Sequence, residues 1–145
     1  IGNRVRSTGM IAYEDIPSYL AMCNIFVTTS VSETFGMSTV EAMSVGLPVM
    51  GIHSAGTSDI VEDGATGFLS TEDVAAFTAK LTYLCLNPSR RQAMGAAARE
   101  ASKQYDIERT TKILLSHYIR LMQSTKPLKK SLDERLMSVL EEFMK

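Results

Sequence analysis

The 145-residue sequence contains no tryptophan, two cysteines and two histidines. Zinc and iron–sulfur sites are excluded because no pair of cysteines or histidines has the close spacing that those sites need. Cys23 and Cys85 both lie in apolar stretches. We therefore predict that they are free thiols buried in the core, which fits a reducing compartment. We interpret His53 and His117 as structural or surface residues.

Long apolar runs and an excess of one charge are also missing. No apolar run reaches the roughly 18–20 residues of a membrane-spanning helix. The net charge is −1, so we expect no nucleic-acid partner, which would normally require a basic face. The lysines at 126, 129 and 130 indicate a solvated turn, and contact with an anionic membrane stays an open alternative. We expect a cytoplasmic location, with peripheral attachment to the inner membrane face left open.

The first 70 residues contain short β-branched and apolar runs separated by glycine and proline. They predict strands over 5–8, 25–28, 48–52 and 67–69, and helices over 16–23, 38–45 and 58–62. The strands lack clear alternation, as in a parallel sheet that is buried on both faces. This order predicts an α/β fold with a Rossmann-like parallel sheet of about four strands.

The rest of the chain has a helical pattern. Helices are predicted over 74–86, 90–104, 107–122 and 132–144. Their expected N-caps are Thr71, Ser89, Asp106 and Ser131. We assign residues 1–126 to a partial Rossmann-like domain and residues 127–145 to a linker and an amphipathic C-terminal helix.

The segment from Ser30 to Val49 joins a predicted strand end to a helix N-terminus through a loop that contains Gly36. A helix N-terminus attracts phosphate because its first N–H groups are unpaired and its dipole is positive there. Gly36 allows a ligand to approach the backbone closely. The amides of Gly36, Met37 and Ser38 are therefore the expected phosphate donors, at the sheet edge where ligands bind in open α/β folds.

Glu33 and Glu41 flank this loop. A carboxylate accepts two neighbouring hydroxyls, so each glutamate suits the vicinal diol of a sugar. Two such glutamates on either side of a phosphate site suit a ligand that has a sugar on each side of a diphosphate. A nucleoside diphosphate sugar is such a ligand. The residues alone leave a second interpretation open, in which Glu41 interacts with the helix dipole and Glu33 is a solvated loop residue.

The pattern Glu33-Thr-Phe-Gly-x4-Glu-Ala-Met-x2-Gly-x-Pro-Val49 resembles the signature of the group 1 (family 4-type) retaining glycosyltransferases. The segment 55–69 resembles the part of that family that follows the signature. The resemblance implies the GT-B architecture of two Rossmann-like domains, of which this chain is part of the C-terminal, donor-binding one. It implies a hexosyltransferase that uses a nucleotide-sugar donor, with no metal cofactor, and no Asp-x-Asp metal motif occurs in the sequence.

The resemblance also implies roles for individual residues. Glu33 holds the donor sugar at the catalytic centre, and Glu41 holds the ribose hydroxyls. The amides of Phe35, Gly36 and Met37 contact sugar and phosphate, with Ser38 next in line. Met10 and Ile11 lie near the nucleobase. The acceptor, a carbohydrate or a lipid-linked molecule, is bound by an N-terminal domain outside this chain.

We therefore expect the isolated chain to be inactive. We also expect it to pack against the rest of its polypeptide or, when alone, to self-associate or rearrange. In a sheet of order 3-2-1-4-5-6, strand 5–8 has no neighbour and strand 25–28 has a bare edge. Two alternatives are a nucleotide-sugar-binding module without activity of its own and a non-catalytic α/β interaction domain.

Overall fold

The computed structural model describes residues 2–124, in two units that divide between Tyr105 and Asp106. The first unit contains a three-stranded parallel sheet in the order β1-β2-β3. Its strands are Phe26–Val27, Val49–Ile52 and Gly67–Ser70. Phe26 pairs with Val49, and Val49 pairs with Gly67. The α/β class, the parallel pairing and this strand order confirm the prediction.

The predicted strand over 5–8 is wrong. These residues follow a short 3-10 helix, η1 (Gly2–Arg4), and form no ladder with any described strand. A strand requires a hydrogen-bonding neighbour, and within the described residues β1 is bonded only to β2. Val5 is accordingly 67% exposed. Among residues 2–124 the sheet therefore has three strands rather than about four, and the edge of β1 that lacks a partner there is the edge that the sequence predicted.

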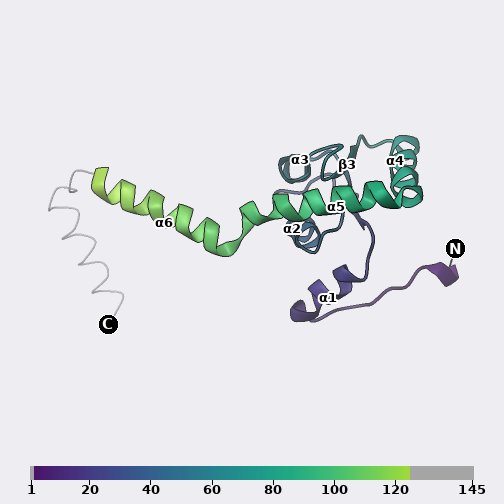
Figure 1. Cartoon of the computed structure of the whole chain (residues 1–145), viewed down its shortest axis with the longest axis horizontal. Coiled ribbons are helices and arrows are strands. Elements are labelled where there is room, and N and C mark those ends of the chain that lie inside the picture. Colours follow the sequence, from purple (N-terminus) through teal and green to yellow (C-terminus); the bar gives the residue numbers. More distant parts are fainter. Residues whose placement is uncertain (1, 125–145) are drawn as a thin grey trace. The chain divides into compact units, whose positions relative to one another are not determined.

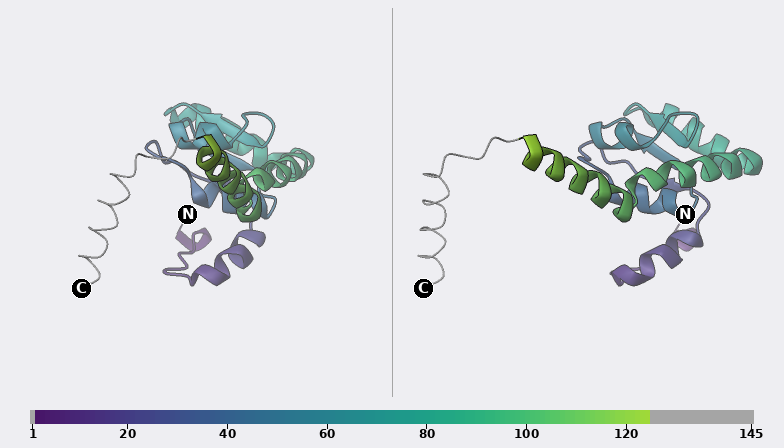
Figure 2. Two further views of the ribbon diagram at one scale, coloured as in Figure 1. Left: turned by 90° about the vertical axis from the view of Figure 1, so that its left-hand side faces the viewer. Right: turned by 60° about the vertical axis from the view of Figure 1, so that its left-hand side comes forward.

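Helices alternate with the strands and then follow them. Their bounds are Ile16–Ala21 (α1), Met37–Ser44 (α2), Ala55–Ile60 (α3), Val74–Leu86 (α4) and Pro88–Ser102 (α5). Two further 3-10 helices are Tyr13–Asp15 (η2) and Lys103–Tyr105 (η3). Figures 1 and 2 show η2 and α1 to one side of the sheet and its covering helices.

Two predicted helix caps are corrected. Asp73, not Thr71, caps α4, because its Oδ1 accepts a 2.7 Å hydrogen bond from the Ala76 N–H. Helix α5 begins at Pro88, two residues before the predicted start, so Ser89 lies inside the helix. Proline suits a first helical position, where its missing N–H has no partner to lose.

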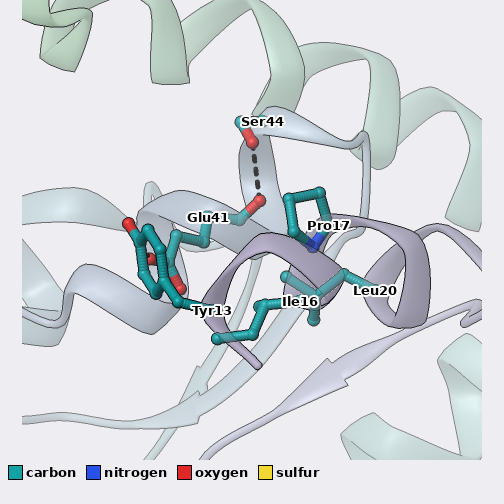
Figure 3. A pocket seen from close by; sticks show the side chains of 6 residues that line it. All are labelled: Tyr13, Ile16, Pro17, Leu20, Glu41 and Ser44. Atoms are coloured by element: carbon teal, nitrogen blue, oxygen red, sulfur yellow. Dashed lines mark hydrogen bonds between the residues drawn. The ribbon is translucent and has the colours of Figure 1, made fainter. Parts of the chain in front are cut away.

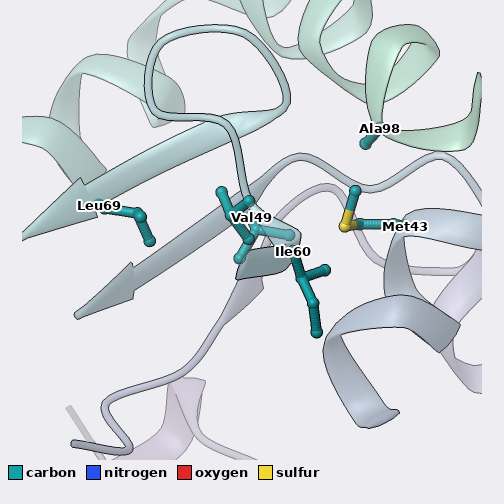
Figure 4. Packing of buried hydrophobic residues seen from close by; sticks show 6 residues of the cluster. Met43, Val49, Ile60, Leu69 and Ala98 are labelled. Carbon is teal, nitrogen blue, oxygen red and sulfur yellow. The ribbon is translucent and has the colours of Figure 1, made fainter. Parts of the chain in front are cut away.

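Both faces of the sheet are covered, because alternate strand residues point in opposite directions. Val49 and Leu69 pack on one face with Met43 of α2 and Ile60 of α3 (Figure 4). Met50 and the partly buried Phe68 pack on the other face. There they meet Phe77, Leu81 and Leu84 of α4 and Met94 of α5.

Helix α5 closes the end of the sheet at which β2 begins. A Cβ atom on Gly95 would lie 2.2 Å from the Gly46 carbonyl oxygen and 3.5 Å from Pro48. Only glycine permits this close approach of α5 to the chain that enters β2. The carboxyl ends of the strands, on the opposite edge, stay available for a ligand.

The two cysteines are free, as predicted, but both are exposed. The prediction of burial is therefore wrong. Cys23 follows the end of the short helix α1, where its Sγ lies 3.4 Å from the Tyr19 carbonyl oxygen. Cys85 lies on α4 one residue after the buried Leu84, and its side chain is therefore turned away from the core.

The second unit contains α6 (Ile107–Ser124) within the described residues. Asp106 caps it as predicted, since Oδ1 accepts hydrogen bonds from the N–H groups of Glu108 and Arg109. Helical spacing places Leu114, Tyr118 and Leu121 on one face. The predicted helix 132–144, its capping Ser131 and the lysines at 126, 129 and 130 lie outside the described residues.

Candidate functional site

Gly36 is the N-cap of α2 and has a left-handed backbone with φ 60° and ψ 52°. A side chain is strained in this conformation, so glycine is required there. The first helical hydrogen bonds run from the N–H groups of Thr39 and Val40 to the Gly36 carbonyl oxygen, at 2.9 and 3.2 Å. The N–H groups of Met37 and Ser38 precede these bonds and belong to the unpaired donors of a helix start. Both residues are exposed.

Glu33 is partly buried, and its Oε1 accepts a 3.1 Å hydrogen bond from the Gly36 N–H. The Gly36 amide, one of the three predicted phosphate donors, is therefore already engaged within the chain. The second carboxylate oxygen of Glu33 keeps its acceptor capacity. The arrangement fixes the Glu33 carboxylate beside the helix N-terminus and leaves the amides of Met37 and Ser38 as the available donors.

Helix α3 supports this loop through its backbone. The Gly56 N–H donates a 2.9 Å hydrogen bond to the Glu33 carbonyl oxygen. A Cβ atom on Gly56 would lie 2.6 Å from both the Glu33 oxygen and the Thr34 carbonyl carbon. The predicted start at residue 58 is wrong, because α3 begins at Ala55 after its N-cap, Ser54, which accepts a 3.3 Å bond from the Thr57 N–H.

Phe35 contacts the end of the first unit. Its ring meets Tyr105 edge to face, with centroids 5.7 Å apart and the planes at 81°. The Tyr105 hydroxyl donates a 3.3 Å hydrogen bond to the Asp59 carbonyl oxygen. Burial, and to a smaller extent the negative charge of Asp59, raises the pKa of Tyr105 above its ordinary value. Tyr105 thereby joins the loop to α3.

Glu41 lies one turn into α2 and faces a different set of residues (Figure 3). Its Oε1 accepts a 3.3 Å hydrogen bond from the Tyr13 hydroxyl, and its carbonyl oxygen accepts a 2.7 Å bond from Ser44 Oγ. A cavity of about 90 Å³ lies between η2, α1 and α2. Its lining consists of Tyr13, Ile16, Pro17, Leu20, Glu41 and Ser44. Glu41 is the one charged residue of that lining.

Met10 and Ile11, the residues predicted to lie near the nucleobase, precede η2 in the chain. Met10 is fully exposed and Ile11 is partly buried, and neither lines the cavity beside Glu41. The sequence did not point to Tyr13, which is 28 positions from its partner. The sequence also did not show the packing role of Gly56, although this glycine belongs to the segment 55–69 that resembles the family.

Other features of the described residues carry less chemistry. Among residues 2–124, no group of three or more His, Cys, Asp or Glu side chains is arranged to hold a metal ion. Over the same residues, no helix is long and apolar enough to cross a membrane. His53 and His117 are both exposed, as predicted for surface residues, and His53 Nδ1 lies 3.3 Å from Ser58 Oγ.

Comparisons with known proteins agree with the sequence pattern. The family model described as "Glycosyl transferases group 1" matches residues 1–101. The chain is 38% identical over 116 residues to sulfoquinovosyl transferase SQD2 of Arabidopsis thaliana, covering 77% of this chain and 23% of that protein. It is 35% identical over 102 residues to the D-inositol 3-phosphate glycosyltransferase of Gordonia bronchialis, covering 70% and 22%.

Solved structures show the same relationship. HepE of Anabaena, in complex with UDP and glucose, is 30% identical with a TM-score of 0.73, covering 82% of this chain and 33% of that one. The sucrose-phosphate synthase of Thermosynechococcus elongatus is 26% identical with a TM-score of 0.79, covering 86% and 32%. The chain thus spans about a quarter of the length of these curated relatives and about a third of the solved ones.

Proposed function

Because the chain belongs to the group 1 glycosyl transferases and has the fold of the C-terminal half of GT-B enzymes, we propose that it binds the donor of a retaining hexosyltransferase. The donor is a nucleoside diphosphate sugar. The observation that carries the proposal is the pair Glu33 and Glu41, held on either side of the α2 N-terminus at the carboxyl end of β1.

Each residue has a distinct task in this proposal. The N–H groups of Met37 and Ser38 contact the diphosphate, and the positive end of the α2 dipole stabilises it as the leaving group. Glu33 positions the hydroxyls of the donor sugar through the oxygen that Gly36 does not use. It contacts the substrate at the catalytic centre but does not act as a base.

The nucleoside lies towards α1. Glu41 accepts hydrogen bonds from the ribose hydroxyls, and the loop at Met10 and Ile11 lies near the nucleobase. The Phe35 amide contacts the sugar and phosphate. Because the helix terminus and basic groups elsewhere in the enzyme supply the charge, the reaction needs no metal ion. The acceptor, a carbohydrate or a lipid-linked molecule, binds to another domain, so this chain alone binds the donor without turning it over.

Titration calorimetry with UDP-, GDP- and ADP-sugars tests the proposal. One of these donors should bind, and Glu33→Gln should weaken the sugar nucleotide about tenfold while leaving the parent nucleoside diphosphate unchanged. Glu62→Gln is the matched control, because its side chain is exposed and lies outside the site. Failure of all three donor classes to bind to the complete enzyme would overturn the proposal.

A further inference from the structure

Tyr13 is held against the carboxylate of Glu41. The 3.3 Å bond from its hydroxyl to Oε1 connects η2, before α1, to the middle of α2. Figure 3 shows the Tyr13 ring lying alongside the Glu41 side chain. Ser44 does not compete for this carboxylate, because its hydroxyl donates to the Glu41 carbonyl oxygen.

The hydrogen-bonding capacity of Glu41 leaves room for a diol. An ionised carboxylate offers about four acceptor positions on two oxygens. Within the described residues the Tyr13 hydroxyl takes one position on Oε1. One position on Oε1 and both on Oε2 therefore stay available, which is sufficient for two neighbouring hydroxyls. The bond from Tyr13 also removes rotational freedom from a side chain that would otherwise have to be ordered by the ligand.

A purely structural role does not explain this contact. Tyr13 is 70% exposed, so its ring contributes little to the core. A hydrogen bond on the surface adds little to stability, because water replaces the lost partner. The remaining cavity wall is formed by Ile16, Pro17 and Leu20, which offer no side-chain hydrogen bond to a ligand. Glu41 is thus the charged acceptor of this cavity, and the Tyr13 hydroxyl is hydrogen-bonded to it.

We propose that Tyr13 is a positioning residue that presents Glu41 to the ribose diol and so sets the preference for ribonucleoside over deoxyribonucleoside diphosphates. This inference rests on the proposed function, because it assumes that the ribose of a nucleotide donor lies beside Glu41. It goes further than that function, because it assigns the discrimination between ribose and deoxyribose to a residue outside the Glu33-x7-Glu41 pattern.

The experiment uses Tyr13→Phe, which removes the hydroxyl and keeps the ring. Binding of UDP, GDP and ADP and of their 2′-deoxy forms is measured by calorimetry on the complete enzyme. The affinity for the preferred ribonucleotide should fall about fivefold and that for its 2′-deoxy form about twofold. The ratio of the two affinities therefore decreases. Tyr19→Phe is the matched control, since Tyr19 is a neighbouring exposed tyrosine whose hydroxyl has no hydrogen-bond partner among residues 2–124.

A double-mutant cycle separates positioning from structure. In a Glu41→Gln background, Tyr13→Phe should change neither affinity, because the oriented carboxylate is already gone. Equal losses for ribose and deoxyribose forms in Tyr13→Phe, or an undiminished loss in the Glu41→Gln background, would overturn the inference while the proposed function stands. If no nucleotide binds to the unmodified enzyme, the proposed function itself fails.

Discussion

The two sides of the α2 N-terminus are built in different ways. On the loop side, Glu33 is held by backbone contacts, since its carbonyl oxygen is bonded to the Gly56 N–H and Gly36 is buried. On the side of η2 and α1, Glu41 is oriented by the hydroxyl of the exposed Tyr13. The position of Glu33 is fixed by close backbone packing, whereas the orientation of Glu41 depends on one side-chain contact.

This difference assigns separate tasks to the two sides. Backbone packing fixes the position of the helix terminus and of Glu33 before any ligand arrives, which is the preorganisation that charge stabilisation requires. A side-chain contact at the surface can be altered at little cost in folding. Changes on the loop side should therefore affect stability and donor binding together, and changes on the other side should affect nucleotide affinity and selectivity with little change in stability.

Gly56→Ala should have the largest effect. The new Cβ would lie within 2.6–2.8 Å of three backbone atoms of residues 33–35, and backbone cannot rotate away as a side chain can. We expect the free energy of unfolding to fall by about 3 kcal/mol, the upper end of the range for overpacking. Urea denaturation of the two proteins measures this loss.

Gly2→Ala is the control for the same chemical change, because a Cβ there meets nothing within 4 Å. Its effect should stay within about 0.5 kcal/mol. If Gly56→Ala is as stable as the control and binds the donor as tightly as the unmodified chain, the rigid support of the loop by α3 is refuted.

Tyr105→Ala should have the next largest effect. The substitution removes the edge contact to Phe35 and the hydrogen bond to Asp59. We expect a loss of about 2 kcal/mol, and Tyr105→Phe should lose about 1 kcal/mol because it keeps the ring. Chemical denaturation with both variants separates the ring from the hydroxyl, and equal losses would contradict the edge contact as the main stabilising element.

The dependence of stability on alkaline pH tests the environment of Tyr105 without a substitution in the unmodified chain. Because the pKa of Tyr105 is raised in the folded state, the unfolded tyrosine ionises first, near its ordinary value of about 10. The stabilisation is present below that pH and is lost as the pH rises towards the folded pKa. Denaturation midpoints above pH 10 should fall more steeply for the unmodified chain than for Tyr105→Phe. Equal slopes for the two proteins would exclude Tyr105 as the source of the pH dependence.

The same contrast explains how far the sequence could predict the structure. The loop side follows from local patterns: β-branched strands, Gly36 at a helix start, and two glutamates at fixed spacing. The bounds of α2 and α4 were therefore predicted to within a residue. The start of α3 was missed because the helix begins where Gly56 packs against the backbone of a distant loop, a contact that the local sequence does not encode.

The other side depends on contacts that no local pattern encodes. The pairing of Tyr13 with Glu41 joins separate helices, and an exposed tyrosine in a short 3-10 helix gives no periodic signal. The strand predicted over 5–8 has suitable residues but no neighbour in the described sheet. Propensity alone cannot make a strand there, because a β-strand is defined by the partner to which it is bonded.

Val5→Ala should have the smallest effect and tests that correction. In this structure Val5 is 67% exposed and belongs to no ladder, so truncating it should change the free energy of unfolding by less than about 0.5 kcal/mol. Val49→Ala is the matched comparison, because Val49 is fully buried in the central strand and the same truncation leaves a cavity. It should cost about 2–3 kcal/mol. If urea denaturation of the 145-residue chain instead shows similar losses for the two variants, residues 5–8 are packed against a partner, and self-association measured by light scattering would identify that partner as a second copy.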